Sequence, residues 1–336
     1  MTSPFRNVVA VSRAGLPGFG VDRLSDYAEI RMPDSERPPT AQEMFELVEG
    51  VTGLLCLGND TIDEALLDAA GSSLRIVALA SMGYDAVDCE AAASRGVTVS
   101  NAPGVLSETT ADLAFSLILM ARRRLIEASD SLRSGNWRVF RMQDYLGLDV
   151  HGSTLGLVGY GQIGRAVARR ANGFGMRVIH YDPAATSIDK YSTPVDFGHL
   201  LETADIVSLH VPLTESTRNL IGERQFNAMK PTSTLVNTSR GGIVDESALL
   251  AALAAREIYS AGLDVFENEP VGVGVTKYVD ESRLVVLPHV GSATEDTRAA
   301  MVDLAVDNVI DVLEGRPART ALPPSGPGDA RKATTP

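Results

Sequence analysis

Cysteine, long apolar runs and basic residues are all scarce in this chain. The 336 residues include two cysteines, Cys56 and Cys89, and neither belongs to a pair with metal-ligand spacing. We therefore expect a reducing compartment without disulfides, and no metal site. No stretch approaches the roughly 18 apolar residues that span a membrane, and no signal peptide is visible. These absences together predict a cytoplasmic protein.

Acidic residues outnumber basic ones, 43 to 30, for a formal net charge of −13. No basic stripe interrupts this excess, so we expect neither nucleic acid nor an anionic membrane surface as a partner. An anionic small molecule would have to be attracted by a local positive site, because the field of the whole protein repels it.

Candidate strands and helices alternate along the chain, which is typical of parallel sheets covered by helices on both faces. The length predicts two domains, each with its own core. The candidate strands of the first unit are residues 8–11, 29–32, 53–57, 75–78 and 97–100. Those of the second unit are residues 154–158, 177–181, 206–210, 233–238, 260–264 and 284–287.

Two capping boxes mark predicted helix starts, one from Thr40 to Glu43 and one from Ser292 to Glu295. A third helical pattern is uninterrupted from residue 107 to about 134. The helix predicted over 293–313 follows the last strand of the second unit, so we expect it to return to the first. The predicted domains are therefore 1–102 with 293–322, an inserted domain over 103–292, and a disordered tail over 323–336.

A glycine motif in the second unit predicts dinucleotide binding. An apolar strand leads into residues 159–164, Gly-Tyr-Gly-Gln-Ile-Gly, and a helical pattern follows. Gly159 permits a tight turn, Gly161 lets the backbone approach a pyrophosphate, and Gly164 lets the helix pack close to the strand. The start of that helix offers free N–H groups and the positive end of a dipole to the phosphates.

The next strand of the second unit, residues 177–181, ends in Asp182. A carboxylate at this position can accept both hydroxyls of an adenosine ribose, and it would repel a 2′-phosphate. The strand, the glycine turn, the helix and this acid about 20 residues further on form a specific pattern. They predict NAD as the cofactor.

Three further strand ends carry residues that suit hydride transfer to a 2-oxo acid, because ligands of open parallel sheets bind beyond the carboxyl ends of the strands. Arg240, followed by two glycines, can grip a carboxylate in a bidentate pair and polarise the adjacent carbonyl. His289 can protonate the forming alkoxide, and Glu269 is our candidate for the carboxylate on its other ring nitrogen. Asp264 can accept from a nicotinamide amide, and the nicotinamide would supply the hydride.

Taken singly, each of these residues also has a purely structural explanation. An arginine beside two glycines is often a surface loop residue, a glutamate before proline is usually solvated, and a lone histidine is more often structural. We assign the remaining histidines to structural roles; they are His151, His180, His199 and His210. No serine or cysteine sits in a nucleophile elbow, and no spacing indicates zinc.

Six segments together resemble the D-isomer-specific 2-hydroxyacid dehydrogenase family. They are residues 81–85, 101–105, 159–164, 237–242, 262–270 and 288–294. The resemblance runs from about Gly53 to Gly315. It implies an α/β fold of two doubly wound parallel-sheet domains, with a Rossmann NAD-binding domain inserted in a flavodoxin-like substrate domain. It also implies a homodimer, an active site in the interdomain cleft, and Arg240, Glu269 and His289 as the catalytic set.

The resemblance further implies which residues hold the ligands. The backbone N–H groups of Met82 and Gly83 would hold the substrate carboxylate together with Arg240 and His289. The implied cofactor contacts are Gly159, Gly161, Gln162, Ile163, Gly164, Asp182, Val211, Thr238, Ser239, Arg240, Asp264, His289 and Gly291.

Within the family the chain is most similar to glyoxylate/hydroxypyruvate reductases, on residues 104–113, 133–137 and 289–294. This similarity implies an NAD-dependent reductase of a small 2-oxo acid, glyoxylate or hydroxypyruvate. Two features depart from that pattern. Many such reductases use NADPH and lack an acid at the position of Asp182, and residues 271–282 lack the usual proline-rich form beside the active site.

Two alternatives stay open at this point. One is a dehydrogenase of another D-2-hydroxy acid, such as D-3-phosphoglycerate. The other is an NAD-sensing binding protein like the corepressors built on this scaffold, which keep the same three residues. Formate dehydrogenase is disfavoured, because that subfamily has glutamine where this chain has Glu269.

Overall fold

The computed structural model describes residues 7–184, 189–279 and 281–324. The chain divides into two units, residues 1–106 with 292–336, and residues 107–291. The predicted disordered tail lies outside the described residues, apart from Pro323 and Pro324. Among the residues that are described, no helix is long and apolar enough to cross a membrane.

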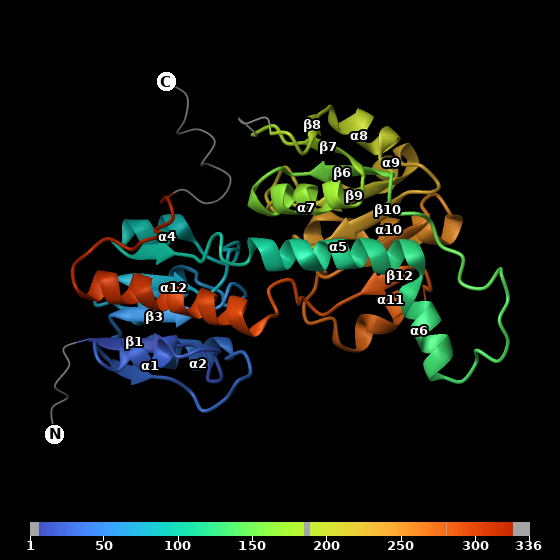
Figure 1. Ribbon diagram of the computed structural model, residues 1–336. Coiled ribbons are helices and arrows are strands. Elements are labelled where there is room, and N and C mark those ends of the chain that lie inside the picture. The colour runs from blue at the N-terminus through green and yellow to red at the C-terminus, as the bar shows by residue number, and fades with distance from the viewer. Residues whose placement is uncertain (1–6, 185–188, 280, 325–336) are drawn as a thin grey trace. The chain divides into compact units, whose positions relative to one another are not determined.

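Unit 1 contains a five-stranded, fully parallel sheet in the order β2-β1-β3-β4-β5, which is the flavodoxin-like order. Its strands are β1 (Val8–Val11), β2 (Glu29–Arg31), β3 (Gly53–Cys56), β4 (Ile76–Leu79) and β5 (Thr98–Ser100). Its helices are α1 (Gly20–Leu24), α2 (Ala41–Val48), α3 (Glu64–Ala70), α4 (Cys89–Ser94) and α12 (Glu295–Leu313). One core cluster joins α12 to β1, β3 and β4, and a second joins α2, α3 and α4 to the same strands (Figure 1).

Unit 2 contains a seven-stranded parallel sheet in the order β12-β11-β10-β9-β6-β7-β8. Its strands are β6 (Thr154–Val158), β7 (Arg177–Tyr181), β8 (Thr193–Pro194), β9 (Ile206–Leu209), β10 (Thr234–Asn237), β11 (Ser260–Leu263) and β12 (Leu284–Val286). Counted from β6, the order is 7-6-5-4-1-2-3, which is the Rossmann order with one added strand. The predicted fold of two doubly wound parallel sheets is confirmed.

Helices cover this second sheet (Figure 1). The helices of unit 2 are α5 (Ser107–Arg123), α6 (Leu125–Arg133), α7 (Gln162–Gly173), α8 (Phe197–Thr203), α9 (Glu223–Ala228), α10 (Glu246–Ala255) and α11 (Thr276–Val279), with the short 3₁₀ turns η1 (Gly241–Ile243) and η2 (Gly272–Val275). Helix α6 has no buried residue and extends away from the sheet. Helix α5 packs closely on β11, because a Cβ at Gly262 would lie only 3.1 Å from the Cβ of Leu117. The small residue in the strand therefore lets the long helix approach the sheet.

The predicted helix starts have mixed outcomes. The capping box of α2 is confirmed: the Thr40 side chain accepts from the Glu43 N–H, and the Glu43 carboxylate accepts from the Thr40 N–H at 2.8 Å. The capping box expected at Ser292 is wrong. Thr294 caps α12 instead by accepting from the Thr297 N–H, so the helix begins at Glu295.

The single helix predicted from residue 107 to 134 is also wrong. Arg124 has a left-handed backbone, with φ of 53°, and separates α5 from α6. The cause is a segment distant in sequence: the Leu148 N–H donates to the Arg122 carbonyl at 2.8 Å, and a Cβ at Gly147 would overlap that carbonyl. The returning chain thus takes the acceptor that would have continued the helix.

Candidate active site

The glycine turn after β6 is shaped by close backbone approach. Gly159 has φ of 95°, and a Cβ there would lie 2.6 Å from the carbonyl of His210, just before Val211 at the end of β9. By contrast, nothing lies within 4 Å of a Cβ built on Gly161. Gly161 is also the N-cap of α7 and gives its N–H groups no side-chain acceptor. This open helix start, which continues through Gln162 and Ile163, suits a phosphate.

Asp182 lies at the mouth of this turn, directly after β7. Its Oδ2 accepts from the Tyr160 N–H at 2.8 Å, and its Oδ1 accepts from the Ala184 N–H at 2.8 Å. These two bonds fix the carboxylate beside the glycine turn. Each of its oxygens keeps a second lone pair for a further donor.

The turn after β10 places Arg240. The Asn237 side chain donates to the Arg240 carbonyl at 2.8 Å and accepts from the Ser239 N–H at 3.0 Å. A Cβ on Gly241 would overlap the carbonyl group of Phe266, so the backbones of the two loops touch. Only glycine fits there, and the contact holds the loop of Arg240 against the loop that carries Glu269. Asn237 lies in one of the segments that carry the family resemblance, but no role was predicted for its side chain.

His289 and Glu269 form a hydrogen-bonded pair. The distance from His289 Nδ1 to Glu269 Oε2 is 2.6 Å, and Glu269 Oε1 accepts from the Phe266 N–H at 2.7 Å. Burial alone would raise the pKa of Glu269, but these two hydrogen bonds and the charges of His289 and Arg240 hold it below its ordinary value. The carboxylate therefore stays ionised and accepts the Nδ1 proton, which leaves Nε2 for proton transfer.

Asp264, at the end of β11, fixes the backbone around His289. Its carbonyl accepts from the His289 N–H and its Oδ1 accepts from the Val290 N–H, both at 2.8 Å. His289 has φ of 53°, a conformation that a non-glycine residue adopts only where its surroundings enforce it. The strain at this residue supports a functional role for it.

Two buried oxygens in this region have no partner among the described residues. They are Oδ2 of Asp264 and Oγ1 of Thr238. Burial raises the pKa of Asp264 to about 6, against the opposing effects of the Val290 and Gly291 N–H groups and the His289 charge. Unsatisfied buried polar atoms are rare and point to an unseen binding partner. A cofactor carboxamide, with both donors and an acceptor, fits the pair.

Gly291 borders the same place. A Cβ on Gly291 would lie 3.3 Å from Oδ2 of Asp264 and 3.5 Å from the side chain of Thr110. Its lack of a side chain therefore keeps the unpartnered oxygen accessible from that side.

Residues 271–282, which depart from the family pattern, are anchored by Tyr278. Its ring is buried and packs on Phe266 with centroids 5.0 Å apart. Its hydroxyl donates to the buried carboxylate of Glu246, which also accepts from the Glu267 N–H at 2.7 Å. The atypical segment is thus tied to the loop that carries Glu269. Asp280 lies outside the described residues.

Two of the other histidines, His180 and His210, have structural surroundings. His180 stacks on Tyr160 with ring centroids 3.9 Å apart and bonds Ser192 Oγ at 2.9 Å. Burial lowers the pKa of His210 to about 4, so its ring is neutral, and Nε2 lies 2.9 Å from Ser208 Oγ. Among the described residues, no group of three or more histidine, cysteine or acidic side chains is arranged to hold a metal ion.

Met82 and Gly83 lie in unit 1, in the loop after β4, and both are half-buried. The other predicted site residues lie in unit 2, at the carboxyl ends of β6, β7, β9, β10, β11 and β12. Within that unit the structure brings Glu269 and His289 into contact and places the loop of Arg240 against that of Glu269.

Residues 115–291 match the family model of the D-isomer specific 2-hydroxyacid dehydrogenase NAD-binding domain. The chain is 43% identical to a glyoxylate reductase of Korarchaeum cryptofilum over 304 residues, covering 89% of this chain and 91% of that protein. It is 38% identical to glyoxylate/hydroxypyruvate reductase B of Shigella boydii over 315 residues, covering 92% and 96%.

Solved structures agree with these sequence relatives. The TT0316 protein of Thermus thermophilus superposes with a TM-score of 0.89 at 40% identity, covering 94% of this chain and 100% of that one. An NADPH-dependent glyoxylate/hydroxypyruvate reductase of Sinorhizobium meliloti gives 0.81 at 34% identity, covering 96% and 99%. With a matched domain model and relatives that span nearly the whole chain, this protein belongs to the D-isomer specific 2-hydroxyacid dehydrogenase family of oxidoreductases.

Proposed function

We propose that this protein reduces a small 2-oxo acid, glyoxylate or hydroxypyruvate, to the D-2-hydroxy acid with NADH. The observation that carries the proposal is the His289–Glu269 pair, held on a strained turn beside the loop of Arg240. The names of the relatives, glyoxylate reductase and glyoxylate/hydroxypyruvate reductase B, support the substrate class. The scarcity of cysteine, with both thiols free and buried, supports a cytoplasmic setting.

The residues present fit a nicotinamide dinucleotide. The open helix start at Gly161, with Gln162 and Ile163, would hold the pyrophosphate. The unpartnered oxygens of Thr238 and Asp264 would hold the nicotinamide carboxamide. The remaining proposed cofactor contacts are Gly159, Gly164, Asp182, Val211, Ser239, Arg240, His289 and Gly291. When bound, the cofactor supplies the hydride.

The side chains divide the remaining work. Arg240 grips the substrate carboxylate with its planar guanidinium and polarises the neighbouring carbonyl, assisted by the N–H groups of Met82 and Gly83. His289 donates the Nε2 proton to the oxygen that becomes the alcohol. Glu269, on Nδ1, fixes the ring and stabilises the imidazolium that donates this proton.

The fixed carboxylate of Asp182 supports a preference for NADH. With NADPH in place of NADH, the Asp182 carboxylate would lose its hydrogen bond to the ribose 2′-hydroxyl and would repel the 2′-phosphate. We expect kcat/KM to be at least about tenfold higher with NADH than with NADPH, or roughly 1.4 kcal/mol. The Sinorhizobium meliloti relative is NADPH-dependent, so equal use of both cofactors by this chain would contradict the role of Asp182.

The decisive experiment is oxidation of NADH, and separately of NADPH, with a panel of 2-oxo acids that includes glyoxylate, hydroxypyruvate and 3-phosphohydroxypyruvate. Highest kcat/KM with one of the first two supports the proposal. Highest kcat/KM with 3-phosphohydroxypyruvate favours the phosphoglycerate alternative. Tight NADH binding without turnover of any acid favours an NAD-sensing binding protein.

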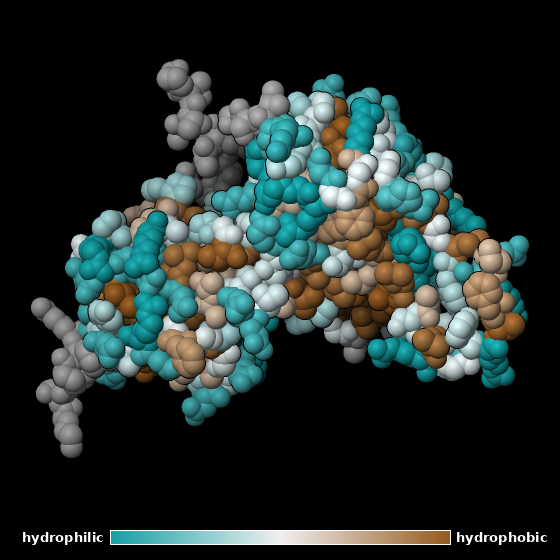
Figure 2. Space-filling view, viewed as in Figure 1, coloured by the Kyte–Doolittle hydropathy of each residue, from teal (hydrophilic) through white to brown (hydrophobic). Residues whose placement is uncertain are grey.

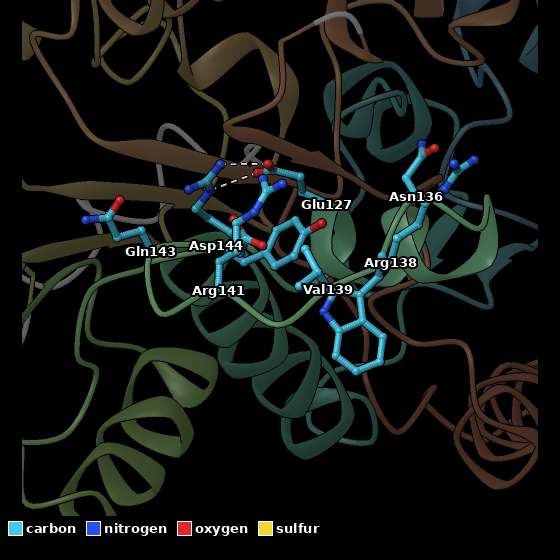
Figure 3. Close-up of a pocket in the computed structure, with 10 residues that line it drawn as sticks. Glu127, Asn136, Arg138, Val139, Arg141, Gln143 and Asp144 are labelled. Atoms are coloured by element: carbon cyan, nitrogen blue, oxygen red, sulfur yellow. Dashed lines mark hydrogen bonds and ion pairs between the residues drawn. The ribbon is translucent and has the colours of Figure 1, made fainter.

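We further propose that the active protein is a homodimer, because exposed apolar side chains concentrate on α6 and the loop after it. Among the described residues, eight of the fourteen exposed large apolar side chains lie between Leu125 and Leu146, and Phe140 and Met142 are 73% and 80% exposed. The loop also frames a hollow of about 400 Å³ with mixed polar walls, whose lining residues are drawn in Figure 3. Figure 2 shows apolar residues in brown on the surface of unit 2. Apolar surface of this extent in one segment favours a second copy of the chain as its cover.

Light scattering on the purified protein tests the dimer. A mass of two chains is expected, and Phe140→Asp should shift it toward one chain. Phe19→Asp is the matched control, because Phe19 is 81% exposed but lies in unit 1. A monomeric protein at working concentration would contradict the proposal.

A further inference from the structure

We infer that Asn101 and Ser81 are positioning residues that aim three backbone N–H groups of unit 1, those of Met82, Gly83 and Tyr84, at the substrate carboxylate. The inference rests on the proposed function and deepens it. It adds Tyr84 to the two N–H groups expected from the family resemblance, and it assigns roles to two side chains that had none.

Three consecutive carbonyls of this loop each accept a hydrogen bond. The Ser81 carbonyl accepts from the Ala102 N–H at 2.8 Å. The Met82 carbonyl accepts from the Asn101 side-chain amide at 2.7 Å. The Gly83 carbonyl accepts from the Ser81 hydroxyl at 2.8 Å. No carbonyl in this run is left to turn freely.

Each of these hydrogen bonds orients a whole peptide group, and so it also orients the N–H group of the following residue. In a planar trans peptide, the C=O and the N–H point to opposite sides. Fixing the carbonyls of residues 81, 82 and 83 therefore fixes the directions of the N–H groups of residues 82, 83 and 84, each opposite to the carbonyl of its own peptide. None of these three N–H groups donates to another group in the described part of the chain, and all three residues are half-buried. Successive backbone N–H groups in a turn make an anion-binding concavity, and we infer that these three do so.

The loop is supported from below by a second rigid turn. A Cβ on Gly58 would lie 2.9 Å from the Gly83 carbonyl, so the backbone of the 57–60 turn supports the loop directly. That turn is closed by Asp60, whose Oδ2 accepts from the Leu57 N–H at 2.9 Å and whose other oxygen pairs with Arg13. The Arg13–Asp60 pair beneath this turn is buried, so the support exists before any ligand binds.

Asn101 is the residue to change, because it is 6% exposed and acts on the middle peptide. Asn101→Ala should raise KM for the preferred 2-oxo acid about tenfold, the effect of one lost, well-aligned hydrogen bond. KM for NADH should stay unchanged. The matching 2-oxo amide, which has no carboxylate, should keep its wild-type KM. Ser81→Ala should reproduce this pattern through the Gly83 carbonyl.

Thr320→Val is the matched control. The Thr320 hydroxyl donates to the Asn101 backbone carbonyl at 2.6 Å and accepts from Asn308 at 2.8 Å. Its loss weakens the same buried junction but leaves the Asn101 side chain on Met82. A lower melting temperature with an unchanged KM is expected. If Thr320→Val raises KM as Asn101→Ala does, the effect is structural and the inference is overturned.

A second measurement separates this inference from the proposed function. Amide NMR shifts of Met82, Gly83 and Tyr84 are followed while oxalate, a carboxylate of the substrate's size, is added to the whole protein. Shifts in the wild type that vanish in Asn101→Ala support the inference even if no 2-oxo acid is turned over. Turnover of glyoxylate with no shift of these amides, or with unchanged KM in Asn101→Ala, overturns the inference and leaves the proposed function standing.

Discussion

The carboxyl ends of the two parallel sheets offer different kinds of groups to a ligand. In unit 1, buried side chains support the loops: Arg13 pairs with Asp60, and Asn101 is bonded to Met82. The ligand-binding groups proposed there are backbone N–H groups. In unit 2, the side chains of Thr238 and Asp264 carry unpartnered oxygens, and the proposed catalytic groups are the side chains of Arg240, Glu269 and His289. The proposed contribution of unit 1 is thus backbone, whereas the proposed chemistry of unit 2 depends on side chains.

This contrast predicts whether a substitution should change stability or catalysis. In unit 1 the buried side chains hold structure together, so their loss should lower stability or misalign the loop. In unit 2 the half-exposed side chains Arg240, Glu269 and His289 contribute little packing. Their loss should change the chemistry and leave the fold intact.

The largest expected effect is that of His289→Ala. Removing the acid should lower kcat by about 10²–10⁴, the usual contribution of a positioned acid–base group, while NADH binding stays nearly unchanged. Steady-state kinetics and cofactor titration measure both. His151→Ala is the control, because that side chain is 77% exposed. Full activity in His289→Ala would refute its role and break the contrast between the two edges.

Asp60→Ala should produce the opposite pattern. It leaves the Arg13 guanidinium buried without its partner, and breaking a buried ion pair costs about 3–5 kcal/mol. Hydrogen exchange of the five-stranded sheet measures the loss within unit 1. Asp68→Ala removes an exposed ion pair, so it should cost at most about 1 kcal/mol. Equal protection in both variants would show that the Arg13–Asp60 pair does not support this edge.

Arg240→Lys sharpens the comparison within unit 2. Lysine lacks the planar fork, so KM for the oxo acid should rise and kcat should fall, lowering kcat/KM about 10–100-fold. The free energy of unfolding should change by no more than about 0.5 kcal/mol. Arg224→Lys, an exposed position on α9, is the control. Lower stability with normal kinetics would instead make Arg240 a structural loop residue.

The smallest effect is expected for Glu269→Gln and concerns pH. The carboxylate stabilises the imidazolium that donates the proton. In the Glu269→Gln variant, kcat/KM should therefore decline at a lower pH than in the wild type as the pH is raised. The pKa of Glu269 is itself held low. Its contribution to stability is therefore present above the ordinary value of 4.5 and is lost as the pH falls through the lowered value. Glu267→Gln, two residues away and exposed, should leave the pH profile of kcat/KM unchanged. An unaltered profile in Glu269→Gln would contradict the pairing.

Local patterns predicted the parts of the fold that local sequence determines. The bounds of β6 and β7 were predicted correctly, because the apolar run of β6 ends at the glycine turn and that of β7 ends at Asp182. The break at Arg124 was missed, since it depends on Gly147 and Leu148 returning to α5. β8 was missed because two residues carry no periodicity.

The candidate site divides in the same way. Residue type and position at strand ends indicated Arg240, Glu269 and His289, because those chemistries are readable from the chain. The contact between Asn101 and Met82 joins residues 19 positions apart in loops after different strands. No spacing in the sequence reveals such a bond, and neither does it reveal which oxygens of Thr238 and Asp264 stay unpartnered.

The absence of any side chain between Gly241 and Phe266 also has a consequence for protein engineering. Because the backbones of the loops after β10 and β11 are in direct contact, a change in the conformation of one loop displaces the other. Grafting a new specificity loop onto residues 266–282 would therefore succeed only if the 237–242 turn were transplanted with it. In recombination, these two segments, which are separate in the sequence, therefore have to be exchanged together.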